Sequence, residues 1–276
     1  THATPHSWLY PPLPVGLVEA VKDSIVPANQ DKTLRNAFGY QALAWGVASA
    51  AIPTMTQAKV MGVTATAGSN LLLRGLGWSN LALAGRIMRS SDAEAATTGV
   101  IFFSLLYTTL KAAVAAGTYA GYVGHIVTWN LAMAVIAARR NGGIWSTATS
   151  ADTKLLDEVL PRDYEVSTRN IVGMQVWAWG LGSLVAPAKV LSVLGLAASP
   201  LVNALTLCNA ITNLILGGKI MGGNDDDAAA NGVTFFGAWG ILGTLAVGAG
   251  LMTGQYASLI AVWNLAMTAY CATKLL

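Results

Sequence analysis

The feature that most constrains this chain is that one sequence unit occurs twice. Residues 33–46 (TLRNAFGYQALAWG) match residues 167–180 (STRNIVGMQVWAWG), and VTWNLAM at 127–133 returns as AVWNLAM at 261–267. Shorter matches follow in the same order between them: SNLALAGRIM (79–88) with TNLILGGKIM (212–221), and GVIFF (99–103) with GVTFF (232–236). A collinear repeat of this length indicates a tandem duplication, so both copies are expected to adopt the same fold.

Each copy contains four apolar runs that are long enough to cross a bilayer or nearly so. Apolar residues make up 54% of the chain and charged residues only 11%, against roughly 25% charged in soluble domains. About 20 apolar residues in a helix span the hydrocarbon core. The predicted spans are residues 34–52, 69–88, 95–119 and 122–138 in the first copy, and 172–186, 201–221, 229–252 and 256–273 in the second.

Four spans per copy is an even number, so both copies enter the membrane from the same side. The predicted fold is therefore an all-α integral membrane protein of about eight transmembrane helices, arranged as two parallel four-helix repeats. The expected divisions are an extended N-terminal arm (1–32), the first repeat (33–140), a polar linker (141–168) and the second repeat (169–276). Pro53 and Pro187 end the first run of each copy, where we expect a kink or an early stop.

The basic residues gather on one predicted side of the membrane. Nearly all of them fall at the termini or in the even-numbered loops: Arg35, Arg86, Arg89, Arg139, Arg140, Arg162, Arg169, Lys219 and Lys274. The positive-inside rule places both termini on the cytosol, stroma or matrix side. On the same side, Asp225–Asp227 precede the seventh predicted span and are expected to cap its helix or to lie in solvent, with cation binding as the alternative.

Four asparagines inside the apolar runs are the first candidate site residues: Asn80, Asn130, Asn213 and Asn264. A buried amide has two donors and an acceptor to satisfy, so we expect these side chains to hydrogen-bond between the second and fourth helices of each copy. The alternative is that their oxygens bind a pigment or a cofactor metal.

Three ionisable residues in the apolar runs belong to the first copy alone. His125 could ligate a haem iron or a chlorophyll magnesium, because ionisable groups within a membrane are functional candidates. Arg74 and Lys111 are long enough to extend toward the membrane surface. The two cysteines, Cys208 and Cys271, both lie in apolar runs and are expected to be buried free thiols.

Each copy resembles the four-helix membrane modules of the DoxX-like kind. The resemblance is carried by a helix ending in Pro53 or Pro187, a glycine in the next segment (Gly62, Gly195), and an Asn/Gly-containing helix ending in Arg86 or Lys219. It covers about the first two-thirds of each copy and implies a fold but no activity. The pattern of chlorophyll a/b antenna proteins, with an intramembrane Glu paired to an Arg, is absent from the sequence.

The favoured function is that of a non-catalytic accessory subunit in a larger energy-converting complex of an organelle, with a photosystem or its antenna as the best guess. Chlorophyll and carotenoid are the expected cofactors, and a larger membrane complex and lipids the expected partners. The plastid thylakoid is favoured and the mitochondrial inner membrane comes second. The chain starts at Thr1 rather than Met, which suits a removed targeting peptide or a trimmed chain.

Other functions have less support from the sequence. A transporter or channel built on the two parallel repeats is the main alternative, with Asn80, Asn213, Arg74 and His125 lining its path. No nucleophile-base motif and no Walker A sequence occurs, so an enzyme is not expected. A net charge of only +3 without a basic run gives no basis for nucleic-acid binding.

Overall fold

The computed structural model describes residues 15–26, 31–142, 160 and 165–276, and in these residues the regular structure is entirely helical. The first copy contains α2 (Leu34–Ala51), α3 (Pro53–Met55), the π-helical turn η1 (Thr56–Met61), α4 (Ala67–Arg89), α5 (Asp92–Ala115) and α6 (Val123–Arg140). The second contains α9 (Thr168–Val185), α10 (Pro187–Leu194), α11 (Pro200–Met221), α12 (Asp225–Gly248) and α13 (Ala257–Leu275). In both copies a helix of 18 residues is followed by a short helical segment, which is α3 with η1 in the first copy and α10 in the second, and then by three helices of 18 to 24 residues.

Equivalent residues begin and end the helices of the two copies. Thr33 and Ser167 cap α2 and α9 by accepting a hydrogen bond from the backbone N–H three residues on. The same cap geometry recurs at Ser91 of α5 and Asn224 of α12. Such caps satisfy N–H groups that the first helical turn leaves unpaired.

The two prolines break the helices where the sequence predicted. α2 ends at Ala51 and α9 at Val185, each two residues before its proline, and each proline opens the following short helix. α9 and α10 meet at 113°. Gly62 and Gly195 then turn the chain back with φ of 64° and 71°, a conformation that side chains disfavour.

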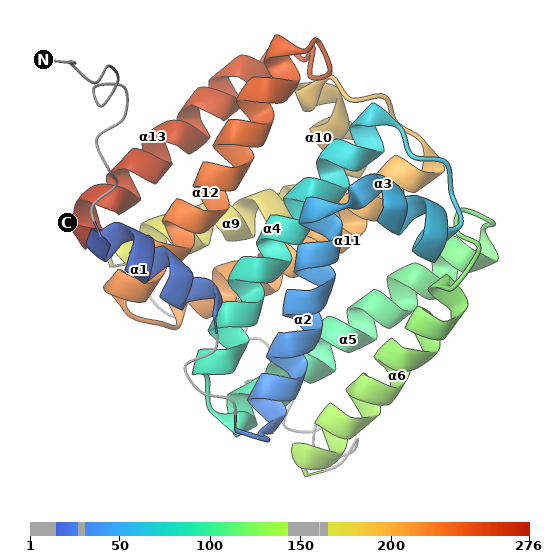
Figure 1. Ribbon diagram of the computed structural model, residues 1–276, viewed down its shortest axis with the longest axis horizontal. Helices are drawn as coiled ribbons and strands as arrows, with labels where there is room; N and C mark the ends of the chain where they lie inside the picture. Colours follow the sequence, from blue (N-terminus) through green and yellow to red (C-terminus); the bar gives the residue numbers. More distant parts are fainter. Residues whose placement is uncertain (1–14, 27–30, 143–159, 161–164) are drawn as a thin grey trace, which may run out of the picture.

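The helices pack as antiparallel pairs around a central contact between the copies (Figure 1). α2 lies against α4 and α5 against α6, as α9 lies against α11 and α12 against α13. α4 and α11 contact each other, while α5 rests on α11 and α12 rests on α4. Each outer pair thus leans on the other copy, and one hydrophobic core includes Phe103 of the first copy and Ile215 of the second.

Hydrogen bonds gather the corresponding helix ends of both copies at one end of the bundle. The backbone N–H of Arg35 donates to Asp92 at 3.1 Å, and that of Arg169 donates to Asp225 at 2.9 Å. At the centre, Arg86 of α4 forms an ion pair of 3.0 Å with Asp227 of α12. The copies therefore point in the same direction.

The opposite end is closed by the two short helical segments. The backbone N–H groups of Ala120 and Tyr122, in the α5–α6 loop, donate to Met61 and Val60 of η1. Gly254, in the α12–α13 loop, donates to Leu194 of α10. Each loop is thereby tied to the short segment of its own copy.

The sequence predicted an extended N-terminal arm, but within that arm Val15–Ile25 form helix α1. α1 packs on α4, α12 and α13. The side chain of Ser24 is fully buried, its hydroxyl lies 3.2 Å from that of Thr234 and its carbonyl rests on Gly85. The glycine leaves room for the backbone of α1 to approach α4 closely. Residues 1–14 and 27–30 of the arm, and 143–159 and 161–164 of the linker, lie outside the described residues.

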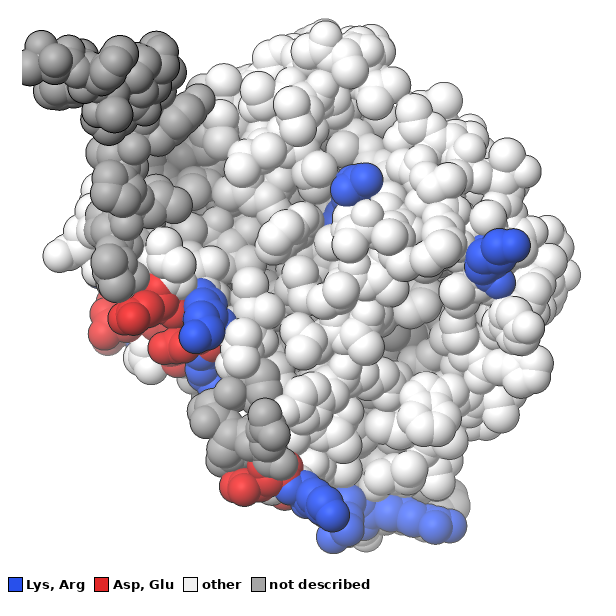
Figure 2. All heavy atoms as spheres, viewed as in Figure 1, with Lys and Arg blue, Asp and Glu red and all other residues white. Residues whose placement is uncertain are grey.

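Three described helices, α5, α11 and α12, are long and apolar enough to cross a membrane, or four if the bent pair α9–α10 counts as one span. This is fewer than the eight that the sequence predicted. α4 carries Arg74, Arg86 and Arg89 within its length, and such charges lower mean hydropathy. Figure 2 shows charged side chains concentrated along one edge, with a largely uncharged face beyond it apart from isolated basic side chains.

Candidate functional site: twin apolar pockets

The structure contains two apolar pockets at equivalent places in the two copies. The first, of about 350 Å³, lies between α2, α5 and α6, and the second, of about 660 Å³, lies between α9, α12 and α13. Both volumes fall within the range of small-molecule sites. Identical residues occupy matching positions in the two pockets, among them Gln41, Trp45, Trp129 and Asn130 in the first and Gln175, Trp179, Trp263 and Asn264 in the second.

The recurring Trp-Asn pair of the sequence therefore lines a pocket in each copy. Trp129 and Trp263 are each 55% exposed, so the pockets reach the outer surface of the bundle. A ligand can therefore enter each pocket from the outer surface of the bundle.

Each pocket is completed by the central helix of the other copy. Leu205, Cys208 and Thr212 of α11 contribute to the first pocket, and Leu71 of α4 contributes to the second. Both sites thus depend on the association of the two copies.

In the second pocket the polar side chains bond to one another and to the backbone. Nε1 of Trp263 donates to Oε1 of Gln175 at 2.7 Å, and Nε2 of Gln175 donates to the carbonyl of Ile171 at 3.1 Å. Nδ2 of Asn264 donates to the carbonyl of Ile260 at 2.7 Å. Both polar atoms of the Gln175 side-chain amide therefore have a hydrogen-bond partner.

In the first pocket three buried polar atoms have no hydrogen-bond partner among the described residues. They are Oε1 of Gln41, Oδ1 of Asn130 and the hydroxyl of Tyr119. Trp129 therefore does not donate to Gln41 as Trp263 does to Gln175. An unpaired buried polar group costs about 1–3 kcal/mol, so this pocket carries groups that a ligand would satisfy.

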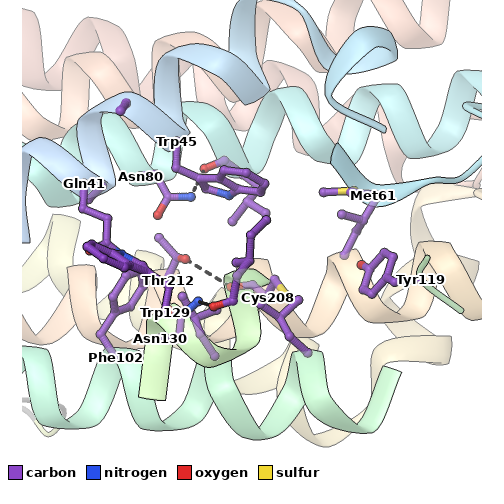
Figure 3. Close-up of a pocket in the computed structure, with 17 residues that line it drawn as sticks. Gln41, Trp45, Met61, Asn80, Phe102, Tyr119, Trp129, Asn130, Cys208 and Thr212 are labelled. Carbon is purple, nitrogen blue, oxygen red and sulfur yellow. Dashed lines mark hydrogen bonds between the residues drawn. The ribbon is translucent and has the colours of Figure 1, made fainter. Parts of the chain in front are cut away.

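Tyr119 lies at one end of the first pocket near Met61, with its hydroxyl directed into the cavity (Figure 3). It is 4% exposed, and this burial raises the pKa of its hydroxyl above the ordinary value. Its counterpart in the second pocket is Met252, which has no hydrogen-bonding proton. Gln41 and Asn130 lie toward the other end of the cavity.

The prediction that the four asparagines bond between helices is wrong. Asn80, Asn130 and Asn264 each donate to the carbonyl four residues earlier in their own helix. Asn213 is fully buried, and neither of its amide atoms has a partner among the described residues. A short side chain reaches its own preceding turn more easily than a neighbouring helix.

One polar contact between the copies comes from a pair that sequence reasoning missed. Ser79 of α4 donates to Asn209 of α11 at 3.3 Å. Gln41, Gln175 and Tyr119 were also not recognised as candidate site residues. The identical glutamines in the repeat were a usable signal, since a polar side chain kept within an apolar helix needs a partner.

The three ionisable residues of the first copy lie away from both pockets. His125 is exposed near the start of α6, with its ring 5.9 Å from that of Tyr122. Nη1 of Arg74 donates to the carbonyl of Ala50 at 2.9 Å, and Nζ of Lys111 lies 3.2 Å from the hydroxyl of Tyr107. Cys208 and Cys271 are buried and free, as predicted.

A charged cluster lies where α4, α11 and α12 meet. Arg86 is 8% exposed, and its Nη2 donates to the carbonyl of Lys219 at 2.7 Å in addition to its ion pair with Asp227. The cap of α12 is Asn224 rather than an aspartate; Asp225–Asp227 occupy the first turn, where the helix dipole favours acids. Among the described residues, no group of acidic, histidine or cysteine side chains is arranged to hold a metal ion.

Comparison of the chain with family models, with curated proteins and with solved structures finds no match. The resemblance to DoxX-like modules therefore stays a prediction.

Proposed function

We propose that this protein is a non-catalytic integral membrane subunit that holds apolar pigments in its twin pockets within a larger energy-converting complex. The single observation that carries this proposal is the pair of equivalent apolar pockets that open on the outside of the bundle. A duplicated cavity lined by tryptophan and leucine side chains suits apolar ligands, and its few amides suit their polar groups.

The proposed membrane arrangement has eight spans in two parallel repeats. Each copy has four helices of 18 to 24 residues, α2, α4, α5 and α6 matching α9, α11, α12 and α13. At 1.5 Å per residue these cover about 27 to 36 Å, close to the hydrocarbon thickness. Arg86, the most buried cation of α4, lies at the end of the bundle where the termini would face the stroma or matrix.

The outer surface suits contact with lipids and neighbouring subunits. Large apolar side chains are exposed along the outer helices, among them Leu131 and Ile136 on α6 and Leu245 on α12. A surface of this kind is stable in lipid or against another membrane protein.

Carotenoid and chlorophyll are the proposed pigments, with different places in the structure. The pockets have the apolar walls that a carotenoid needs, and Asn80, Asn130 and Asn264 line them. His125 lies outside the pockets on the exposed face of α6, so it would ligate the magnesium of a chlorophyll at the protein surface.

An absorption spectrum of the protein purified from its native membrane tests this function. We expect carotenoid bands, together with comigration with a larger complex on a native gel. A preparation that carries no pigment and migrates alone would overturn the proposal.

A transporter is less well supported, because the contact between α4 and α11 at the centre is tightly packed. Leu73, Leu83 and Ile215 are fully buried there, and Arg74 is bonded at the exposed surface rather than on the axis.

A further inference from the structure

The two pockets share their walls but differ in the polar atoms they offer. In the first pocket, Oε1 of Gln41 and Oδ1 of Asn130 are buried acceptors without a partner among the described residues, and Asn130 is 3% exposed. An amide oxygen accepts hydrogen bonds and never donates them. A ligand that satisfies these atoms must therefore bring a donor.

A hydroxyl group is one donor that an otherwise apolar molecule can carry. A ketone, an ester or a plain hydrocarbon would leave both amide oxygens unpaired. The hydroxyl of Tyr119 can donate or accept, and it lies at the other end of the cavity from Gln41 and Asn130 (Figure 3). Seven residues of α6 separate Val123, close to Tyr119 in sequence, from Asn130, which corresponds to about 10 Å along the helix.

The second pocket lacks these features. Nε1 of Trp263 already donates a hydrogen bond to Oε1 of Gln175 at 2.7 Å. Met252 replaces Tyr119 and Gly243 replaces Leu110, which widens the cavity. The buried polar atom left unpaired among its lining residues, Nε1 of Trp239, is a donor and gives no advantage to a hydroxyl over a carbonyl.

We propose that the first pocket selects an isoprenoid alcohol, one end of which enters the cavity so that its hydroxyl group donates to Gln41 or Asn130, while the second pocket binds the hydrocarbon skeleton without requiring a hydroxyl. This inference rests on the proposed pigment-binding function and adds that the pockets of the two copies differ in the ligand that they prefer. The duplication supplied two pockets, and the Trp–Gln bond that pairs Oε1 of Gln175 in the second has no counterpart at Gln41 in the first.

Two carotenoids with one skeleton provide the probe: zeaxanthin has a hydroxyl on each end ring, and β-carotene has none. Pigment-free protein in detergent micelles is titrated with each, and binding is followed by the absorption shift. We expect two binding sites per chain, one of which prefers zeaxanthin by about tenfold or more, the gain from a newly paired buried acceptor.

Matched variants locate this preference. Gln41→Leu combined with Asn130→Leu should abolish it, whereas Gln175→Leu in the second pocket should leave it unchanged. The first pair removes unpaired buried polar atoms, so the variant is expected to fold at least as well as the parent.

The outcomes separate the two proposals. Equal binding of both pigments by the parent protein, or a preference that survives Gln41→Leu/Asn130→Leu, overturns the selectivity and leaves pigment binding in place. Failure of both pigments to bind at either site overturns pigment binding itself.

Discussion

At the residue scale, buried amides and hydroxyls account for the main difference between the copies. Gln175 and Trp263 bond to each other, whereas the identical residues Gln41 and Trp129 do not. A sequence reports that both pairs are present, but whether a donor reaches an acceptor depends on two rotamers placed by separate helices. Selectivity can therefore diverge between copies that keep the same polar residues.

Tyr119 gives the structure a pH response. Its pKa is raised by burial above the free value of about 10, so it stays protonated in the folded protein when an unfolded tyrosine ionises. The folded state then binds more protons than the unfolded state above about pH 10, and the free energy of unfolding falls as pH rises. Ultraviolet titration of the parent against Tyr119→Phe should show the extra tyrosinate only well above pH 10, and its appearance near pH 10 would contradict the burial.

The ion pair of Arg86 with Asp227 is a second effect at this scale. Asp227→Asn removes the partner of a buried guanidinium, and we expect a loss of about 2–3 kcal/mol in the free energy of unfolding, since Asp227 remains partly exposed. Asp226→Asn changes the neighbouring exposed carboxylate and serves as the control. Denaturant unfolding in micelles measures both, and equal losses would show that the pair itself contributes nothing.

At the element scale, helix boundaries follow from local chemistry that is repeated in the sequence. Thr33 and Ser167 start helices, and Pro53 and Pro187 break them at the same offset. α1 is the exception: the Pro-rich arm predicted extended chain, and tertiary contact with α4 and α12 determines the helix instead. Helix boundaries are encoded by a few neighbouring residues. Whether a segment with a weak local signal forms a helix depends on its tertiary contacts.

Gly85 is the residue of α4 on which α1 rests. A Cβ at this position would overlap the carbonyl of Ser24, so Gly85→Ala should displace α1 and cost on the order of 1–3 kcal/mol. Trypsin cleavage at exposed Lys22 should become faster. Gly124→Ala, in α6 with open space around it, should leave the cleavage rate unchanged; an equal rate in both variants would refute the contact.

At the scale of the whole molecule, two like-oriented copies share one core and place their charges at one end. The sequence predicted this direction from the even number of apolar runs and from the basic loops. Helix length and apolar composition support fewer spans than eight among the described helices. The arrangement of eight helices therefore rests on packing as well as on composition.

Cysteine labelling tests the orientation directly. In a Cys208→Ala/Cys271→Ala background, Ala93→Cys and Asp226→Cys lie near the charged ends of α5 and α12, and Ala116→Cys and Ala249→Cys near their other ends. In sealed vesicles an impermeant thiol reagent should label one pair and not the other. Labelling of Ala116→Cys together with Asp226→Cys, without the remaining two, would mean that the copies face opposite ways.

The sequence by itself determined the duplication, the helical class, the breaks at Pro53 and Pro187 and the common direction of the copies. These follow from periodic apolar runs, prolines and caps, all of which act over a few neighbouring residues. Only the tertiary structure decided that the Trp-Asn pairs line pockets, that α4 and α11 complete each other's sites, and that Gln41 stays unpaired while Gln175 does not. Those outcomes require atoms far apart in the chain to meet within hydrogen-bond distance, and local sequence does not specify that geometry.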